Sequence, residues 1–273
     1  MGIQPLATEG DETQIGYAGD GARHPDDLDA GEIAAEAVDK ATRLLGATKP
    51  QSGRITILLE PKLAATILGI VSGMLNGESV LKGRSPFADR CGELIASPLL
   101  SMIDDPTRPE SLGAESWDGE GLACRSNALI TGGVLDGFLH NSATGRRAGV
   151  ASTGSALRGS RSLPGVGAQV LVIEPGRRSF DEIITSIDYG LFVNSLAGLH
   201  SGVNPVSGDF SVGADGLMIR DGTLSEPVRE MTIASTIQRM LSDIVEIGGD
   251  AEWLNSGDFM GSLVIGDVSM SGS

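Results

Sequence analysis

The clearest hydrophobic pattern in the sequence predicts an amphipathic helix over residues 30–45. Asp29 can cap the N-terminus of this helix, and Gly46 follows at a position where helices often end. Apolar side chains recur every three or four residues, as one face of a helix requires: Ile33, Ala34, Ala37, Val38, Ala41, Leu44 and Leu45.

A second helix is predicted directly after a short buried strand. Residues 55–59 form an apolar run that is typical of such a strand. Pro61 fits the first turn of a helix, because its missing N–H is not needed there. Residues 63–75 are apolar on nearly every face, so we expect the helix to be buried between a sheet and a neighbouring element.

The first 170 residues otherwise contain few regular patterns. Residues 1–30 are acidic and glycine-rich, and we expect one short strand there. Residues 76–120 are expected to be irregular, because four prolines interrupt them. A β-hairpin is predicted around Thr131-Gly132-Gly133, between apolar runs at 124–130 and 134–139.

The C-terminal third mixes short strands and helices. We expect strands at 168–173, 210–219, 231–233 and 262–268, and helices at 180–186 and 234–247. Because strands and helices do not alternate regularly, the predicted fold class is α+β, with mixed or antiparallel sheets and a few packed helices. We divide the chain into an acidic segment, 1–30, and one region, 31–273.

Composition and charge narrow the function classes. A hydrophobic content of 40% in 273 residues predicts a globular core, and the net charge of −16 argues against binding to nucleic acid. No apolar run approaches the roughly 20 residues that span a membrane. The N-terminus lacks the basic and apolar regions of a signal peptide, so we expect no membrane association and a cytoplasmic location.

The stretch from Leu196 to Gly216 contains five glycines and few bulky side chains. Such a composition suits a backbone that turns tightly or approaches another chain, although a plain glycine-rich surface loop would look similar. The candidate cleft or interface residues are His200, Asn204, Ser207 and Asp209. His200 can brace the loop by hydrogen bonds or line a cleft, and Asp209 is interpreted as a turn carboxylate rather than a general base.

Four arginines lie in the small-residue loop at 143–167: Arg146, Arg147, Arg158 and Arg161. A cluster of this kind can bind a carboxylate or phosphate. A solvated or interface-pairing role is the favoured interpretation.

Several short segments together carry a family resemblance. In chain order they are ITILLEP (55–61), GRSPF (83–87), DDP (104–106), WDGEGL (117–122), STGSALR (152–158) and GSLVIGDV (261–268), with the glycine-rich stretch before the last. The sequence thereby resembles the C-terminal part of the TldD/TldE (PmbA) family, once called modulators of DNA gyrase and regarded as a two-subunit metallopeptidase. Relatives carry a further α/β domain upstream, so we expect that domain to be absent from this sequence.

The resemblance also predicts whether this chain binds zinc. The catalytic subunit of the family has a His-Glu-x-x-x-His helix, and the equivalent helix here follows Pro61. In the best register Gly69, Ile70 and Met74 replace the two histidines and the glutamate. Because a zinc peptidase needs such ligands and a base, we expect no metal and no catalytic residue in this chain.

The resemblance therefore implies a TldE/PmbA-like subunit that binds no metal. Its expected partner is a TldD-like subunit that holds the zinc, and the expected substrate of the pair is an unfolded peptide. Two alternatives stay open: an autonomous metallopeptidase of the same family, or a non-catalytic interaction module.

Overall fold

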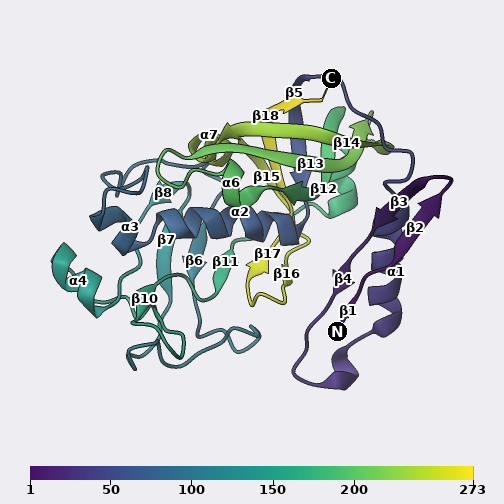
Figure 1. The fold of residues 1–273 in the computed structure, drawn as a ribbon. Helices are drawn as coiled ribbons and strands as arrows, with labels where there is room; N and C mark the ends of the chain where they lie inside the picture. Colours follow the sequence, from purple (N-terminus) through teal and green to yellow (C-terminus); the bar gives the residue numbers. More distant parts are fainter. Residues whose placement is uncertain (273) are drawn as a thin grey trace.

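Two six-stranded sheets and the helix α2 (Pro61–Met74) form the body of the protein in a computed structural model, which describes residues 1–272. Helix α2 crosses the molecule between the strands of the two sheets (Figure 1), and one hydrophobic core joins all three. The mixed sheets and few helices confirm the predicted α+β class.

The first sheet is mixed and closes on itself. Strands β5 and β12 run parallel, and the other pairs are antiparallel. A further pairing between β14 and β18, at Thr232 and Ser271, joins the two sides of the sheet. Its strand order is β14 (Thr223–Thr236), β13 (Asp209–Arg220), β12 (Tyr189–Ala197), β5 (Gly53–Leu59), β18 (Leu263–Ser271) and β15 (Ile244–Ile247).

The second sheet is built from shorter strands. Its order is β16 (Glu252–Trp253), β17 (Phe259–Met260), β11 (Leu171–Ile173), β6 (Met102–Asp104), β7 (Asn127–Thr131) and β8 (Val134–Leu135). Strands β7 and β8 form the predicted hairpin, in which Gly132 and Gly133 both have positive φ, 52° and 81°. These angles explain why the turn needs two glycines.

The remaining elements are small. Three two-stranded sheets pair β1 (Gly2–Ile3) with β4 (Ala18–Gly19), β2 (Leu6–Glu9) with β3 (Glu12–Ile15), and β9 (Ala156–Leu157) with β10 (Gly165–Val166). The helices besides α2 are η1 (Pro25–Asp27), α1 (Ala30–Thr42), α3 (Gly77–Leu81), α4 (Ser142–Ala148), α5 (Phe180–Thr185), α6 (Leu199–Gly202) and α7 (Ile237–Ser242).

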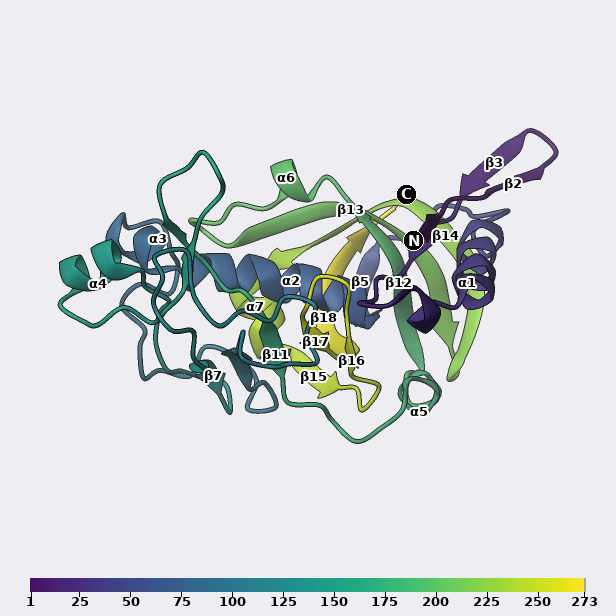
Figure 2. The ribbon, with the colours of Figure 1, turned by 90° about the horizontal axis from the view of Figure 1, so that it is seen from below.

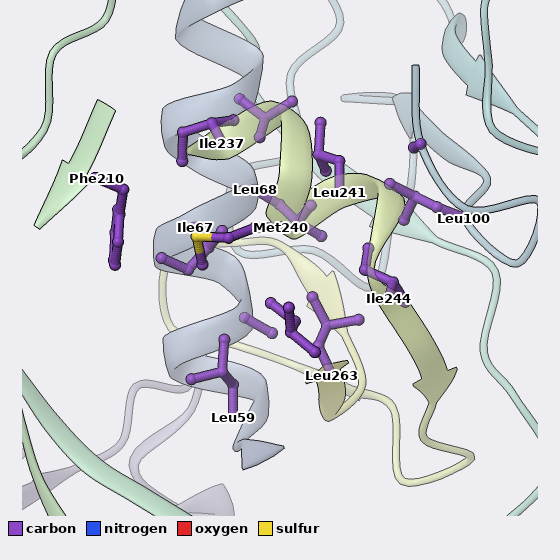
Figure 3. Packing of buried hydrophobic residues seen from close by; sticks show 14 of the residues in the cluster. Leu59, Ile67, Leu68, Leu100, Phe210, Ile237, Met240, Leu241, Ile244 and Leu263 are labelled. Atoms are coloured by element: carbon purple, nitrogen blue, oxygen red, sulfur yellow. The ribbon is translucent and has the colours of Figure 1, made fainter. Parts of the chain in front are cut away.

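The two helices with the strongest sequence signals form where they are expected. The Asp29 side chain accepts hydrogen bonds from the N–H groups of Gly31 and Glu32 and caps α1. Pro61 occupies the first turn of α2. Leu68 of α2 is fully buried and lies in one cluster with Met240 and Leu241 of α7 (Figure 3).

Helix α2 is buried against the core as predicted, but one of its faces, which the sequence pattern did not reveal, is open. Gly69 and Gly73 are exposed, one helical turn apart, and an added Cβ at either position would meet no atom within 4 Å. Their lack of a side chain gives no polar signal, so the sequence pattern hides this open face of α2.

Three other expectations need correction. Residues 1–30 form two short strand pairs rather than one strand. The last helix ends at Ser242, and residues 244–247 form β15 because they pair with β18. Helices α3 and α4 lie in the segments at 76–120 and 143–167, where no regular element was expected, and strand β12 follows the predicted helix at 180–186 without having been predicted; the side chain of Asn141 starts α4 through a capping box with Thr144.

The N-terminal segment and α4 lie at opposite ends of the molecule in both ribbon views (Figures 1 and 2). Within residues 1–272, no helix has both the length and the apolar character needed to cross a membrane. Ser273, the last residue of the predicted region 31–273, lies outside the described residues.

Candidate functional site

Three of the four candidate residues in the glycine-rich stretch form one closed turn. The Asn204 Oδ1 atom accepts hydrogen bonds from the N–H groups of Val206 (2.9 Å) and Ser207 (3.3 Å). The Ser207 hydroxyl donates to Oδ2 of Asp209 at 2.6 Å, and the Asn204 N–H donates to the Asp209 carbonyl. Asp209 thus acts within the turn, in keeping with its interpretation as a turn carboxylate.

Two hydrogen bonds join this turn to α7. Gln238 donates through Nε2 to the Ser207 carbonyl at 2.9 Å, and the Ile237 N–H donates to the Gly208 carbonyl at 2.8 Å. Gly208 has a φ of +85°, and an added Cβ would lie 2.0 Å from Oε1 of Gln238. The backbone angle favours glycine here, and a larger residue would also displace the Gln238 side chain.

His200 lies apart from this network. It is exposed on the short helix α6, and its imidazole has no hydrogen bond or ion pair within the described residues. The structure therefore does not support the interpretation of His200 as a brace of the loop. Its ring is left free to contact a partner or a ligand.

A buried carboxylate from the DDP motif organises a second region. Asp104 is fully buried, and its Oδ1 accepts the N–H groups of Gln169 (2.8 Å) and Val170 (3.0 Å). Burial raises the pKa of Asp104 to about 6, despite these hydrogen bonds. Burial also opposes ionisation of Asp105, but hydrogen bonds from Thr107 and Arg108 outweigh it and hold the pKa of Asp105 below its ordinary value.

Asp118 of the WDGEGL motif is buried like Asp104, and its carboxylate also accepts hydrogen bonds from backbone N–H groups. Its Oδ1 accepts the N–H groups of Glu120 and Leu122, both at 2.9 Å, and its Oδ2 accepts the N–H of Ala156 at 3.2 Å. The Gly119 N–H donates to the Ala156 carbonyl at 2.7 Å. The turn at 117–122 and strand β9 of the STGSALR motif are therefore held together, and we call residues 117–122 and 142–167 the arginine lobe.

His140 stabilises the base of the arginine lobe. Its ring is buried, with Nδ1 3.2 Å from the Thr144 hydroxyl, and burial lowers its pKa. Its carbonyl accepts hydrogen bonds from the Ser152 hydroxyl and the Thr153 N–H. His140, Asp104 and Asp118 were not among the predicted site residues, although the DDP and WDGEGL motifs marked the two aspartates.

Two adjoining cavities lie along the N-terminal half of α2. One, of about 460 Å³, is lined by Lys62, Ala65 and Thr66 of α2 and by residues around Asn255. The other, of about 500 Å³, lies at the N-terminus of α2 and also contacts Lys62 and Asn255. It is lined by seven carboxylates: Asp20, Asp27, Asp29, Glu32, Glu36, Glu60 and Glu252. Burial raises the pKa of Glu252.

The residues of α2 do not fit a zinc site. Gly69 has no side chain, Ile70 is apolar and partly buried, and Met74 points into the core with 1% exposure. The three histidines lie on separate elements: His24 before η1, His140 before α4 and His200 on α6. Across residues 1–272, no three His, Cys, Asp or Glu side chains are grouped so that they could hold a metal ion.

Comparison with known proteins shows that the chain is similar to one family of metallopeptidases. Residues 52–272 match the family model described as the PmbA/TldA metallopeptidase C-terminal domain. A curated relative from Methanothermobacter thermautotrophicus, named metalloprotease, is 29% identical over 254 residues, which is 91% of this chain and 55% of the relative.

Two solved structures have the same fold. TldE from Thermococcus kodakarensis aligns with a TM-score of 0.90 at 27% identity, over 99% of this chain and 62% of TldE. A Thermotoga maritima protein described as a candidate modulator of a DNA gyrase aligns with a TM-score of 0.92 at 28% identity, over 99% of this chain and 61% of that protein. The chain thus spans little more than half the length of these relatives.

Proposed function

Because the chain belongs to the PmbA/TldD metallopeptidase family, we propose that it is a TldE/PmbA-like subunit that holds no metal. In this proposal its partner is a TldD-like subunit that holds the zinc, and the pair cleaves unfolded peptides. The proposal places both subunits in the cytoplasm. The likeness to TldE along nearly the whole chain supports the choice of subunit.

The observation that carries the proposal is the chemistry of α2. The positions that the resemblance pairs with the zinc ligands and the base hold Gly69, Ile70 and Met74, and Met74 is part of the hydrophobic core. None of these side chains can bind zinc or remove a proton from water. The helix contributes to packing, while hydrolysis requires groups from another chain.

The contribution of this chain would be to shape a peptide-binding surface. The face of α2 at Gly69 and Gly73 is unobstructed, and two cavities lie nearer the N-terminus of the same helix, against Lys62. Strand β16 lies at the edge of the second sheet and lines the cavity at the N-terminus of α2. An extended peptide can pair with such an edge through main-chain hydrogen bonds, which suits unfolded substrates of varied sequence.

The test is co-expression with a His-Glu-x-x-x-His relative from the same organism, followed by affinity purification and elemental analysis. We expect the two chains to co-purify, with zinc present in the complex and absent from this chain purified alone. Near-stoichiometric zinc on the lone chain after dialysis against a weak chelator would support the autonomous peptidase instead. Failure to co-purify would favour the non-catalytic interaction module.

A further inference from the structure

The arginine lobe has a charge opposite to that of the rest of the protein. The lobe, residues 117–122 and 142–167, contains four arginines, two acidic residues, Asp118 and Glu120, and no Lys, so its net charge is +2. The net charge of −16 for the whole chain leaves −18 for the remaining residues. The lobe therefore forms a basic end on an acidic protein, far from the acidic N-terminal segment (Figure 1).

The lobe arginines are also unpaired. Eight other arginines of the chain form ion pairs, whereas none is formed by Arg146, Arg147, Arg158 or Arg161 within residues 1–272. All four are exposed, and their guanidinium groups donate no hydrogen bond to the described part of the chain. Their donors are free for carboxylates of another molecule.

Large apolar side chains lie on the same lobe. Leu163 is 90% exposed, Trp117 64% and Val150 52%, and Leu122 and Leu157 are also exposed. The Gly119–Ala156 hydrogen bond and the β9–β10 pairing join the segments that carry Trp117, Leu157 and Leu163. Trp and Arg are enriched at protein interfaces, so their exposure on one lobe favours an interface over a solvated loop.

The lobe is ordered by buried polar groups within it and at its base. Asp118 holds the turn at 117–122 against β9, and Nδ2 of Asn141 donates to the carbonyls of Pro164 (3.2 Å) and Gly165 (3.3 Å). Its apolar side chains are thus presented on a fixed backbone. A surface that is organised before binding loses less entropy when a partner docks.

We infer that the arginine lobe is the surface through which this chain docks its metal-bearing partner, on a patch of carboxylates around an apolar centre. The inference rests on the proposed function and names the interface. Charge complementarity requires an acidic surface and argues against a twofold pairing of two lobes, which would bring two sets of four arginines together; in this proposal the metal-bearing partner supplies that surface.

The test measures the affinity of the full chain for the His-Glu-x-x-x-His relative by calorimetry at low and high salt. Arg158→Glu and Leu163→Ser alter exposed side chains, so thermal melts of both variants should match the parent. We expect each to weaken binding about tenfold, and Arg158→Glu to lose most of its effect at high salt. Matched controls are Arg177→Glu and Val245→Ser, two exposed positions outside the lobe that should change Kd less than about twofold.

The outcomes of this test distinguish failure of the proposed interface from failure of the proposed function. Normal binding by both lobe variants would overturn the interface while leaving the subunit role intact. No binding by the parent chain would overturn the proposed function and the interface with it. Concentration-dependent dimerisation of the chain alone, abolished by Arg158→Glu, would overturn the choice of partner and assign the lobe to a second copy.

Discussion

Oδ2 of Asp118 accepts a hydrogen bond from the N–H of Ala156, 38 residues further along the chain, at a distance of 3.2 Å. The other oxygen of the same carboxylate accepts two N–H groups of its own turn. One buried side chain thereby joins the WDGEGL and STGSALR motifs. The order of the arginine lobe depends on this contact more than on apolar packing, because most of the lobe's large apolar side chains are exposed.

Asp118→Ala should destabilise the protein and loosen the lobe. The change leaves three backbone N–H groups without their acceptor, which costs about 2–4 kcal/mol of unfolding free energy. Urea denaturation measures the loss, and limited proteolysis should show faster cleavage within 142–167. Glu115→Ala, an exposed neighbour, is the control and should change stability by less than about 0.5 kcal/mol.

Asp104 should make stability depend on pH in the direction opposite to an ion-paired carboxylate. Its pKa is about 6 in the folded protein, against an ordinary value of 3.8, so the folded state binds the proton more tightly than the unfolded chain does. The stability from this group is fully present below pH 3.8 and is lost as the pH rises through 6.

The measurement is the unfolding free energy of the parent and of Asp104→Asn between pH 4 and pH 7.5. We expect the parent to lose up to about 3 kcal/mol relative to the variant over this range. Asn keeps an acceptor for Gln169 and Val170 and does not titrate. Parallel pH profiles for the two proteins would show that Asp104 ionises normally.

Two neighbouring residues of α2 should respond very differently to a new charge. Leu68→Asp places an unpaired carboxylate in the core and should cost at least about 4 kcal/mol of unfolding free energy. Gly69→Asp points into open space on the exposed face and should change stability by less than about 1 kcal/mol. Equal losses in thermal melts would mean that the face of α2 is assigned wrongly.

His200→Ala should leave the fold intact. The imidazole is exposed and has no partner within the described residues, so the melting temperature should stay within about 2 °C of the parent. Any loss of peptide cleavage in the assembled complex would then come from a contact outside this chain. The comparison variant is Asn204→Ala, which removes two hydrogen bonds from the turn and should lower the melting temperature.

Local signals in the sequence predicted the elements that depend on them. Asp29 and the apolar spacing after it predicted α1, and Pro61 predicted the start of α2. Residues 244–247 suit a helix or a strand by composition, and only their pairing with β18 decides for a strand. That pairing is not visible in a local pattern.

The site residues divide in the same way: local spacing predicted some of them, and others depend on contacts between distant parts of the chain. Asn204, Ser207 and Asp209 lie within six positions of one another, and the structure brings them together in one turn. Asp104 meets the N–H of Gln169 across 65 residues, so its role could not be derived from spacing. The open face of α2 was not predicted, because glycine has no polar side chain that would indicate exposure in the hydrophobic pattern.

The central claim is that this chain supports peptide cleavage without holding the metal. The most direct measurement titrates the purified chain into a fixed amount of the zinc-loaded His-Glu-x-x-x-His relative and follows cleavage of an unfolded fluorogenic peptide. We predict no cleavage by this chain alone, and a rate that rises with added chain and then saturates as the complex fills. A rate that stays flat throughout the titration, or cleavage by this chain in the absence of the relative, would contradict the claim.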